Sequence, residues 1–516
     1  IEAEGNPELT DERVKAYLEA ALGRLSEEAV NHKDRFESLS ALDVLFEAGI
    51  IPTYSFPQDV VSTYVFHQGD AKKGVAYEPQ RSLDQAISDY APGRAVVVDK
   101  HLFKMGGIFR PPAKGDKWDA PAAAYFRDGH YLRKMSGCPR CGWFGAAQSE
   151  GALCPFCGSA GLEGRNDMLR PWGFAPKDGW TADVADEEEV YSRAEMPLYS
   201  TVPMKDEEMT APWPEGHLRA AFRTNQRIFM VNRGPGDSGF AVCRACGAAA
   251  PWTKTNPLVS IGRPYRRAGL EACQHKSVAL VDLGFDFVTD MLVFEIALDA
   301  KRINVAFQGN PWLHRAPQTL AEALRLAAAD LLDIDSAELV AGYRRRGVND
   351  CVIDVFLYDS LSSGAGYAVS LQNRIPKLFE KTRAILKDCT CDTACYNCIK
   401  HYRNQHVSDR LDRTSGLELL DWAVEGRVAA EIPPAKQREL LRGIEPFLDP
   451  GIVLRNPQGS GLTTAECEGM TVEVKVIPAM AAVPHKRRGQ AVISTGELRF
   501  AKEEAVLKIA EALGRR

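Results

Sequence analysis

Cysteines grouped at metal-ligand spacing are the residues of this chain with the clearest chemistry. Of its 13 cysteines, 11 fall into three clusters. The first cluster holds two Cys-x2-Cys pairs, Cys138 with Cys141 and Cys154 with Cys157. Each pair directs two thiolates to one point, so two pairs complete the tetrahedral S4 shell of a zinc ribbon. Such a closed shell leaves no position for a reactive water molecule, and we therefore predict a structural zinc ion.

The second cluster combines one Cys-x2-Cys pair with a more distant cysteine and histidine. Cys243 and Cys246 form the pair, and Cys273 and His275 follow after 26 residues. We interpret these four residues as a Cys3His zinc site. The alternative is a turn that binds no metal, with Cys273 and His275 buried separately.

The third cluster places four cysteines within ten residues, namely Cys389, Cys391, Cys395 and Cys398. A regular helix cannot wrap four ligands this close in sequence around a tetrahedral ion, so we expect an irregular loop around one metal. An iron–sulfur cluster also takes four cysteines and stays open as an alternative. Together the three clusters predict about three zinc ions per chain, and their thiolates indicate a reducing, cytoplasmic location.

Basic residues mixed with aromatic rings suggest contact with a polyanion. The net charge is −6, so a nucleic-acid site has to be a local patch on this chain. The side chains that we predict to bind nucleic acid are Arg263, Arg266, Arg267, Arg344, Arg345, Arg346, Lys400, Tyr402 and Arg403. We expect the arginine triplet in a hairpin loop, and a further basic run at 485–488 belongs to the same pattern.

Motifs for catalysis are sparse. The chain has no Gly-x4-Gly-Lys-Ser/Thr loop, so we expect no ATP hydrolysis from these residues. Glu473 and Lys475 on a predicted strand match half of a metal-dependent nuclease motif, which is common by chance. Cys351 and Cys467 lack a flanking His or Asp pattern, which argues against a catalytic thiol. The turn at 362–366 could hold a phosphate at a helix N-terminus, or simply join a strand to a helix.

The chain of 516 residues is long enough for several domains, and its mixed patterns predict an α+β multidomain fold. Zinc-ribbon and zinc-knuckle modules are inserted among small α/β units, and no RecA-like motor is expected. The predicted domains are an N-terminal α/β segment (1–114), a zinc ribbon (115–180), an acidic linker (181–220), a strand-rich second zinc module (221–310), a C-terminal zinc-binding domain (311–430) and an α/β tail (431–516). We find no signal-peptide pattern and no apolar run of membrane-spanning length in these residues, so we expect neither secretion nor a membrane span.

Local patterns predict the main elements. We expect helices within residues 10–49, from Ser82, from Thr319 to Leu332, from Gly366 onward as one long amphipathic helix, from Gly416, and near 501–513. Capping boxes with Gln85, Glu322 and Glu418 mark three of these starts. Strands are expected at 94–99, 228–231, 240–242, 278–281 and 291–296, and a hairpin at 339–343 and 351–358. Because the chain begins Ile1-Glu2, we expect a fragment, a processed product or the ordered part of a longer protein.

The segment 359–367, the helix after it, the Cys389 cluster and the stretch 398–413 resemble a zinc-binding domain near the C-terminus of certain superfamily 2 helicases. That domain is named for the mitomycin repair factor A helicase and also occurs in the DISARM and Druantia phage-defence systems. The upstream stretches 51–57, 81–93, 232–234 and 283–290 resemble the preceding region of the defence-type helicases more loosely.

The resemblance implies that the four cysteines of the third cluster bind zinc, and that DNA and a helicase motor are the partners. The motor would lie on a missing N-terminal part or on a separate subunit. Our leading hypothesis is a zinc-stabilised, DNA-binding accessory region of a bacterial superfamily 2 helicase or helicase complex, in phage defence or DNA repair. A purely structural scaffold that contacts the motor protein is the alternative, and a metal-dependent nuclease is the third.

Overall fold

The computed structural model describes most of residues 60–515. The gaps lie at 68–73, 114–117, 150, 181–189, 195–196, 202, 204, 260, 268–269, 271, 307–308, 348–350, 361–365, 458–461 and 485–488. The helices expected within residues 10–49, the basic run at 485–488 and most of the glycine-rich turn at 362–366 therefore lie outside the described residues.

The chain forms two compact units, each assembled from separate stretches of sequence. The first unit takes its described residues from Ile1–Pro203 and Thr224–Asp290, and the second from Met204–Arg223, Met291–Ser360 and Gly366–Arg516. Mixed α and β elements in several small sheets make up both units, which confirms the predicted α+β class. Among the described residues, no helix combines the length and apolar character needed to cross a bilayer.

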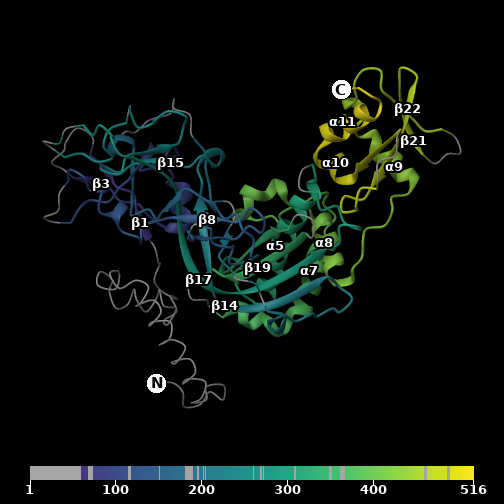
Figure 1. Ribbon diagram of the computed structural model, residues 1–516, viewed down its shortest axis with the longest axis horizontal. Coiled ribbons are helices and arrows are strands. Elements are labelled where there is room, and N and C mark those ends of the chain that lie inside the picture. Colours follow the sequence, from purple (N-terminus) through teal and green to yellow (C-terminus); the bar gives the residue numbers. More distant parts are fainter. Residues whose placement is uncertain are drawn as a thin grey trace, which may run out of the picture. The chain divides into compact units, whose positions relative to one another are not determined.

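Two long strands carry the largest sheet. β14 spans Leu218–Asn232 and β17 spans Val278–Leu298, and both are labelled in Figure 1. The separate strands expected at 278–281 and 291–296 are parts of this one 21-residue strand. Polar residues inside it hid that continuity from the sequence, because Asp282 and Asp286 are held by partners on other elements, Asn166 and Arg133 respectively.

The first unit is rich in short strands. These are β1 (Val60–Ser62), β2 (Val65–Phe66), β3 (Val75–Tyr77), β4 (Gln80–Ser82), β5 (Ala95–Val98), β6 (His101–Ile108), β7 (Leu132–Arg133), β8 (Met135–Gly137), β9 (Phe144–Ala146), β10 (Glu163–Gly164), β11 (Asp167–Leu169), β12 (Phe174–Pro176), β13 (Leu198–Tyr199), β15 (Phe240–Cys243) and β16 (Ala249–Pro251). The helix α4 (Leu83–Asp89) begins after Ser82 as predicted, but the Ser82 side chain makes no cap hydrogen bond. Strand β5, within the strand predicted at 94–99, lies at the edge of the order β12-β6-β5 and leaves Val97 68% exposed.

The second unit packs three helices on one face of its sheet. They are α5 (Pro311–Leu332), α7 (Ile375–Lys387) and α8 (Arg413–Glu425). Alternate residues of β17 and β19 (Cys351–Asp359), such as Phe294, Ile296 and Val355, join the buried core beneath the helices. Each such side chain contributes about 1.5–3 kcal/mol by leaving water, so this face anchors the unit.

Two helices begin earlier than their sequence signals predict. Asn310 caps α5 by accepting a hydrogen bond from the Leu313 N–H, so the start predicted at Thr319 is wrong. Asp412 caps α8 through the Ser415 N–H, so this helix begins at Arg413, three residues before the start predicted at Gly416. In both cases the side chains that we interpreted as capping boxes lie inside the helix.

The predicted hairpin is confirmed, with one correction. β18 (Leu339–Arg346) pairs antiparallel with β19 over its whole length, so the arginine triplet lies in a strand and not in the loop. The long helix expected from Gly366 is broken into α6 (Tyr367–Leu371), a short 3-10 turn and α7. Pro376 at the first turn of α7 favours a new helix start there.

The C-terminal part has its own small core. Strands β20 (Val453–Arg455), β21 (Thr463–Cys467), β22 (Met470–Ile477) and β23 (Gln490–Ser494) form a four-stranded sheet in that order. Three helices, α9 (Pro434–Arg442), α10 (Thr495–Phe500) and α11 (Lys502–Ala512), accompany it. Helix α11 matches the helix predicted near residues 501–513.

Candidate zinc centres and the basic segments beside them

The three predicted ligand sets each gather around one point. In every set the four candidate ligand atoms, one per residue, lie within 4.8 Å of one another. Zinc–sulfur bonds of about 2.3 Å in a tetrahedron place sulfurs about 3.8 Å apart. The observed spacing therefore fits a single ion, whereas an iron–sulfur cluster inserts several atoms between its cysteines.

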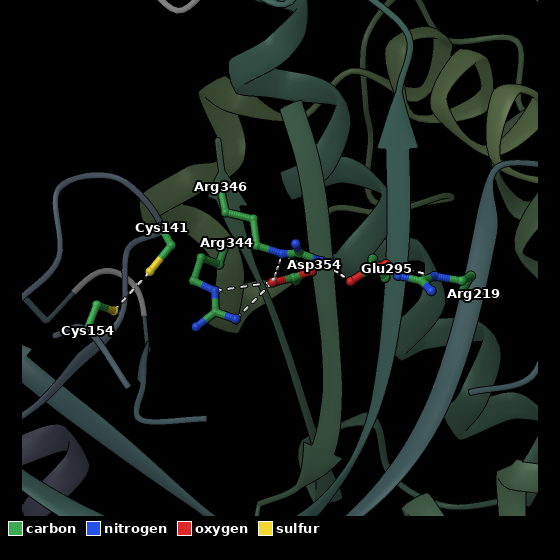
Figure 2. A network of polar contacts seen from close by, with 7 residues as sticks. All are labelled: Cys141, Cys154, Arg219, Glu295, Arg344, Arg346 and Asp354. Carbon is green, nitrogen blue, oxygen red and sulfur yellow. Dashed lines mark hydrogen bonds and ion pairs between the residues drawn. The ribbon is translucent and has the colours of Figure 1, made fainter. Parts of the chain in front are cut away.

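The first zinc centre, made by Cys138, Cys141, Cys154 and Cys157, lies beside the sheet of β8, β9 and β10. The Sγ atoms of Cys138 and Cys157 are 3.7 Å apart, and those of Cys141 and Cys154 are 3.6 Å apart (Figure 2). Both distances match the edge of a zinc tetrahedron. The shell consists of four protein ligands, so its role is structural.

A glycine closes each Cys-x2-Cys turn of the first and second centres. Gly142, Gly158 and Gly247 follow the second cysteine of their turns, and each donates its N–H to the carbonyl of the first cysteine at 2.9 Å. All three have positive φ values, between 65° and 81°, a region that glycine adopts without steric cost. This Cys-x2-Cys-Gly signal was present in the sequence, and our prediction did not use it.

The second zinc centre, made by Cys243, Cys246, Cys273 and His275, depends on strand pairing. Cys243 ends β15, and β15 pairs with the start of β17, just after His275. This pairing brings the distant Cys273 and His275 to the hairpin. The Sγ atoms of Cys243 and Cys273 are 3.8 Å apart, and the Cys246 Sγ lies 3.6 Å from the His275 Nδ1.

The outer nitrogen of His275 fixes which atom can bind the metal. Its Nε2 lies 2.6 Å from the carbonyl oxygen of Ile261, so Nε2–H donates there and Nδ1 is left for zinc. Ile261 is two residues before Arg263, the first of the predicted DNA-binding arginines. The second zinc centre is thereby joined directly to that basic segment.

The third zinc centre, made by Cys389, Cys391, Cys395 and Cys398, is an irregular loop after α7. Its sulfurs are 3.6 Å apart between Cys389 and Cys395 and 3.7 Å apart between Cys391 and Cys398. The Arg413 guanidinium donates to the carbonyl oxygen of Cys391 at 2.6 Å. The loop is thus held by α8 as well as by its own ligands.

The cysteine thiols in these centres differ in pKa. A hydrogen bond from Cys246 lowers the pKa of Cys243 to about 3, while the same contact raises the pKa of Cys246. Backbone and thiol hydrogen bonds lower the pKa of Cys389 to about 7. Some ligands are therefore thiolates at neutral pH, and zinc displaces the protons that remain on the others.

A buried polar network holds the residues after the third centre. Glu322 of α5 accepts hydrogen bonds from Asn404 and faces His401 Nε2, each at 3.2 Å, and it also pairs with Arg325. Although burial opposes ionisation, these partners hold the pKa of Glu322 below its ordinary value. The network fixes the chain on both sides of Tyr402, and Glu322 was missed as a positioning residue because we interpreted it as a helix cap.

The first basic segment, residues 263–267, is interleaved with aromatic rings. The guanidinium of Arg266 lies 3.9 Å from the ring centre of Trp180, and that of Arg267 lies 4.7 Å from the ring centre of Trp118. Arg263 donates to the carbonyl oxygen of Asp119 at 2.7 Å. The predicted arginines are therefore brought together on a preformed aromatic surface.

The arginine triplet on β18 forms ion pairs and hydrogen bonds inside the second unit. Arg344 is buried and forms an ion pair with Asp354 at 2.8 Å, and Arg346 pairs with both Asp354 and Glu295 (Figure 2). Arg345 donates to the carbonyl oxygen of Val305 at 2.9 Å. Because these cations have internal partners, we correct the expectation that the triplet forms an open basic loop.

The second basic segment, residues 396–405, overlaps the end of the third zinc centre and continues beyond it. The Lys400 N–H donates to the Cys395 carbonyl oxygen at 3.0 Å. Tyr402 is 82% exposed, and Tyr396, which sequence reasoning missed, is 69% exposed. Arg403 lies in the same turn.

Two other candidates have local roles. Asp359 accepts hydrogen bonds from the N–H groups of Tyr367 and Ala368 at 3.1 and 2.9 Å, so its carboxylate occupies the start of α6 where a phosphate was considered. Glu473 accepts a hydrogen bond from Gln490 at 3.1 Å, and Lys475 lies 3.9 Å from Glu431. Among the described residues, no metal-type cluster of acidic groups includes Glu473.

Comparison with known proteins agrees with the third zinc centre. The family model described as the MrfA Zn-binding domain matches residues 320–399, which include all four of its cysteines. Residues 320–399 are thus similar to this zinc-binding domain. With three four-ligand sites, the chain is equipped for about three zinc ions. The predicted zinc cofactor and the suspected helicase-associated zinc region are confirmed.

Similarity extends beyond this domain. The Druantia protein DruE of Escherichia coli (strain UMEA 4076-1) is 31% identical over 439 residues, which are 80% of this chain and 23% of that protein. The chain thus spans about a quarter of the relative that it matches. Two crystal structures of the DUF1998 helicase MrfA bound to DNA, the second also with AMPPNP, cover 73% and 72% of the chain at 12% and 11% identity, with TM-scores of 0.36 and 0.28.

Proposed function

We propose that this chain is the zinc-stabilised, DNA-binding accessory region of a superfamily 2 helicase of the phage-defence type. In this proposal the zinc ions have no catalytic role. They hold two basic, aromatic segments in shape for contact with DNA, while a motor elsewhere supplies ATP hydrolysis. The single observation that carries the proposal is the direct backbone link between a zinc centre and each segment.

The first link runs through the second zinc centre. Zinc on Nδ1 of His275 orients the ring, and its Nε2–H holds the carbonyl of Ile261. Arg263, Arg266 and Arg267 follow within six residues. Guanidinium groups neutralise phosphates and stack on bases, so this segment has the chemistry that a DNA strand requires.

The second link runs through the third zinc centre. Cys395 supplies both a thiolate and, through its carbonyl, the acceptor for the Lys400 N–H. Lys400, Tyr402 and Arg403 are the contacts that we propose here. The partners of Glu322 keep this stretch in one conformation, which lowers the entropy cost of binding.

The length of the relative leaves room for a motor outside the matched stretch. DruE is more than four times as long as the matched stretch, since that stretch is 23% of it, and the motor of such a protein would lie in another part or on a partner subunit. We keep the six-segment division, the cytoplasmic location and a role in phage defence as predictions. The choice between phage defence and DNA repair follows the Druantia similarity.

Salt-dependent DNA binding tests the proposal. The chain would be titrated with fluorescent DNA at several salt concentrations, alongside Arg266→Gln/Arg267→Gln. Removing two phosphate contacts should weaken binding and reduce the salt slope by about 2. The matched control, Lys436→Gln/Arg442→Gln, removes two cations from α9 and should leave both quantities unchanged. Absence of binding at low salt would contradict the proposal and favour a scaffold.

A further inference from the structure

Two tyrosines at the third zinc centre project their rings into solvent. Tyr396 is 69% exposed and Tyr402 is 82% exposed, more than any other described tyrosine. Their neighbours behave differently, since Ile399 is fully buried and Asn404 is 2% exposed. The loop therefore buries Ile399 and Asn404 but presents the rings of Tyr396 and Tyr402, although an exposed aromatic ring forgoes about 1.5–3 kcal/mol of burial.

The two rings lie on either side of the residue that closes the zinc loop. Tyr396 lies between the ligands Cys395 and Cys398, inside the loop that the Lys400 N–H closes by donating to the Cys395 carbonyl. Tyr402 follows two residues after Lys400. Zinc on one side and the Glu322 network on the other hold the backbone that carries the rings.

The chemistry around the rings suits a nucleic acid. From Tyr396 to Gln405 the chain has two cationic residues, Lys400 and Arg403, and no acidic one. A zinc ion with four thiolates carries a net charge of about −2, so these cations are partly offset. Stacking on the rings, more than neutralisation of phosphates, would then dominate the affinity at this place.

We propose that Tyr396 and Tyr402 stack on unpaired bases, which makes the third zinc centre a single-strand-selective contact. A duplex conceals its base faces within the helix, whereas a single strand offers a face at every nucleotide. Each ring takes one base, and the phosphates between them lie near Lys400. This inference rests on the proposed DNA-binding function and names the form of DNA that the site selects.

Paired substitutions at the rings test the inference. Binding of a fluorescent oligothymidine strand and of a duplex of equal length would be measured for the full chain, for Tyr396→Leu/Tyr402→Leu and for Tyr396→Phe/Tyr402→Phe. Stacking contributes about 1–3 kcal/mol per base, so each leucine should weaken single-strand binding about 5- to 150-fold. The phenylalanine variant keeps its rings and should retain single-strand affinity, while duplex affinity should stay constant throughout.

Controls separate this inference from folding and from the wider proposal. Zinc content per chain, measured for every variant, should remain that of the parent chain. Tyr191→Leu removes another exposed tyrosine and should leave single-strand binding unchanged. If the parent chain binds DNA but the leucine variant binds single strands equally well, the inference is overturned while DNA binding stands, and the rings would be assigned to a protein contact. A parent chain that binds no DNA contradicts the proposed function itself.

Discussion

Glu295 and Asp354 lie directly opposite each other on the neighbouring strands β17 and β19. Two carboxylates in this register repel each other, and both are nearly inaccessible to water. Arg346 forms ion pairs with both carboxylates, while Arg219 and Arg344 pair with one each (Figure 2). Two arginines of the triplet that we predicted as a basic loop, Arg344 and Arg346, are therefore counter-charges to carboxylates of the second unit's sheet.

Replacing the central arginine should destabilise the second unit. Arg346→Met leaves Glu295 and Asp354 facing each other without the cation they share, and the expected loss is about 3–5 kcal/mol. Urea unfolding, with hydrogen exchange of peptides from β17 and β19, would measure it. Arg219→Met is the matched control, because its side chain is 46% exposed and its loss should stay within about 1 kcal/mol. Equal losses for both variants would argue against a shared clamp.

Two glycines of the Cys-x2-Cys-Gly turns should differ in their tolerance of alanine. At Gly247 a Cβ atom would lie 2.1 Å from the Ile108 carbonyl oxygen, and φ is +81°. At Gly158 φ is +65°, but nothing lies within 4 Å. Gly158→Ala should therefore cost only the left-handed strain of about 1–2 kcal/mol. Gly247→Ala should lose clearly more unfolding free energy and should release zinc from the second centre. Zinc retained after dialysis against a chelator would measure this release. Equal zinc retention by the two variants would contradict the steric argument.

A buried carboxyl on α8 predicts a pH dependence near neutrality. Burial, aided by the charge of Asp412, raises the pKa of Glu418 from 4.5 to about 7. Because the folded pKa is raised, its contribution to stability is complete below pH 4.5 and is lost as the pH rises through 7. Unfolding free energy should therefore fall from about pH 4.5 to pH 7 and level off by pH 8, so that the chain is more stable at pH 6 than at pH 8.

The variant Glu418→Gln should remove this decline and be about 1–2 kcal/mol more stable than the parent chain at pH 8. Urea unfolding at pH 6, 7 and 8 would follow the change while the zinc ligands stay metal-bound. Glu439→Gln alters an exposed glutamate, 64% accessible, and should leave the pH profile as it is. A parent chain equally stable at pH 6 and pH 8 would rule out the proposed titration.

Local patterns were the best guide to the fold and the site. Ligand spacing within ten or twenty residues predicted the first and third metal centres, since a short chain can only place such thiols together. The second centre was predicted across a 26-residue gap, which the pairing of β15 with β17 closes. Distant pairing was harder to foresee. Thr319 accepts a hydrogen bond from the Asp412 N–H, 93 residues away, and Glu322 binds His401. Both resemble a helix cap in sequence, and only the packed structure shows their partners.

The basic segments show the same limit. The spacing of arginines in a sequence does not distinguish a phosphate contact from a buried ion pair. For the triplet, the carboxylates that form the ion pairs, Glu295 and Asp354, lie on β17 and β19. At residues 263–267 the arginines contact the rings of Trp118 and Trp180. These rings are uncharged, so the segment keeps its positive charge. The exposure of Tyr396 likewise depends on how the zinc loop packs, and no sequence signal marks it.

Comparing one ligand substitution in each of two zinc centres tests the central claim most directly. His275→Ala and Cys154→Ser should each remove about one of the three zinc ions, which metal analysis would verify. Only His275→Ala disconnects the arginines at 263–267, so it should weaken DNA binding about tenfold, a loss of about 1.4 kcal/mol, while Cys154→Ser should keep the parent affinity. Equal DNA affinity of the two variants would contradict the claim that zinc positions the DNA-binding segment.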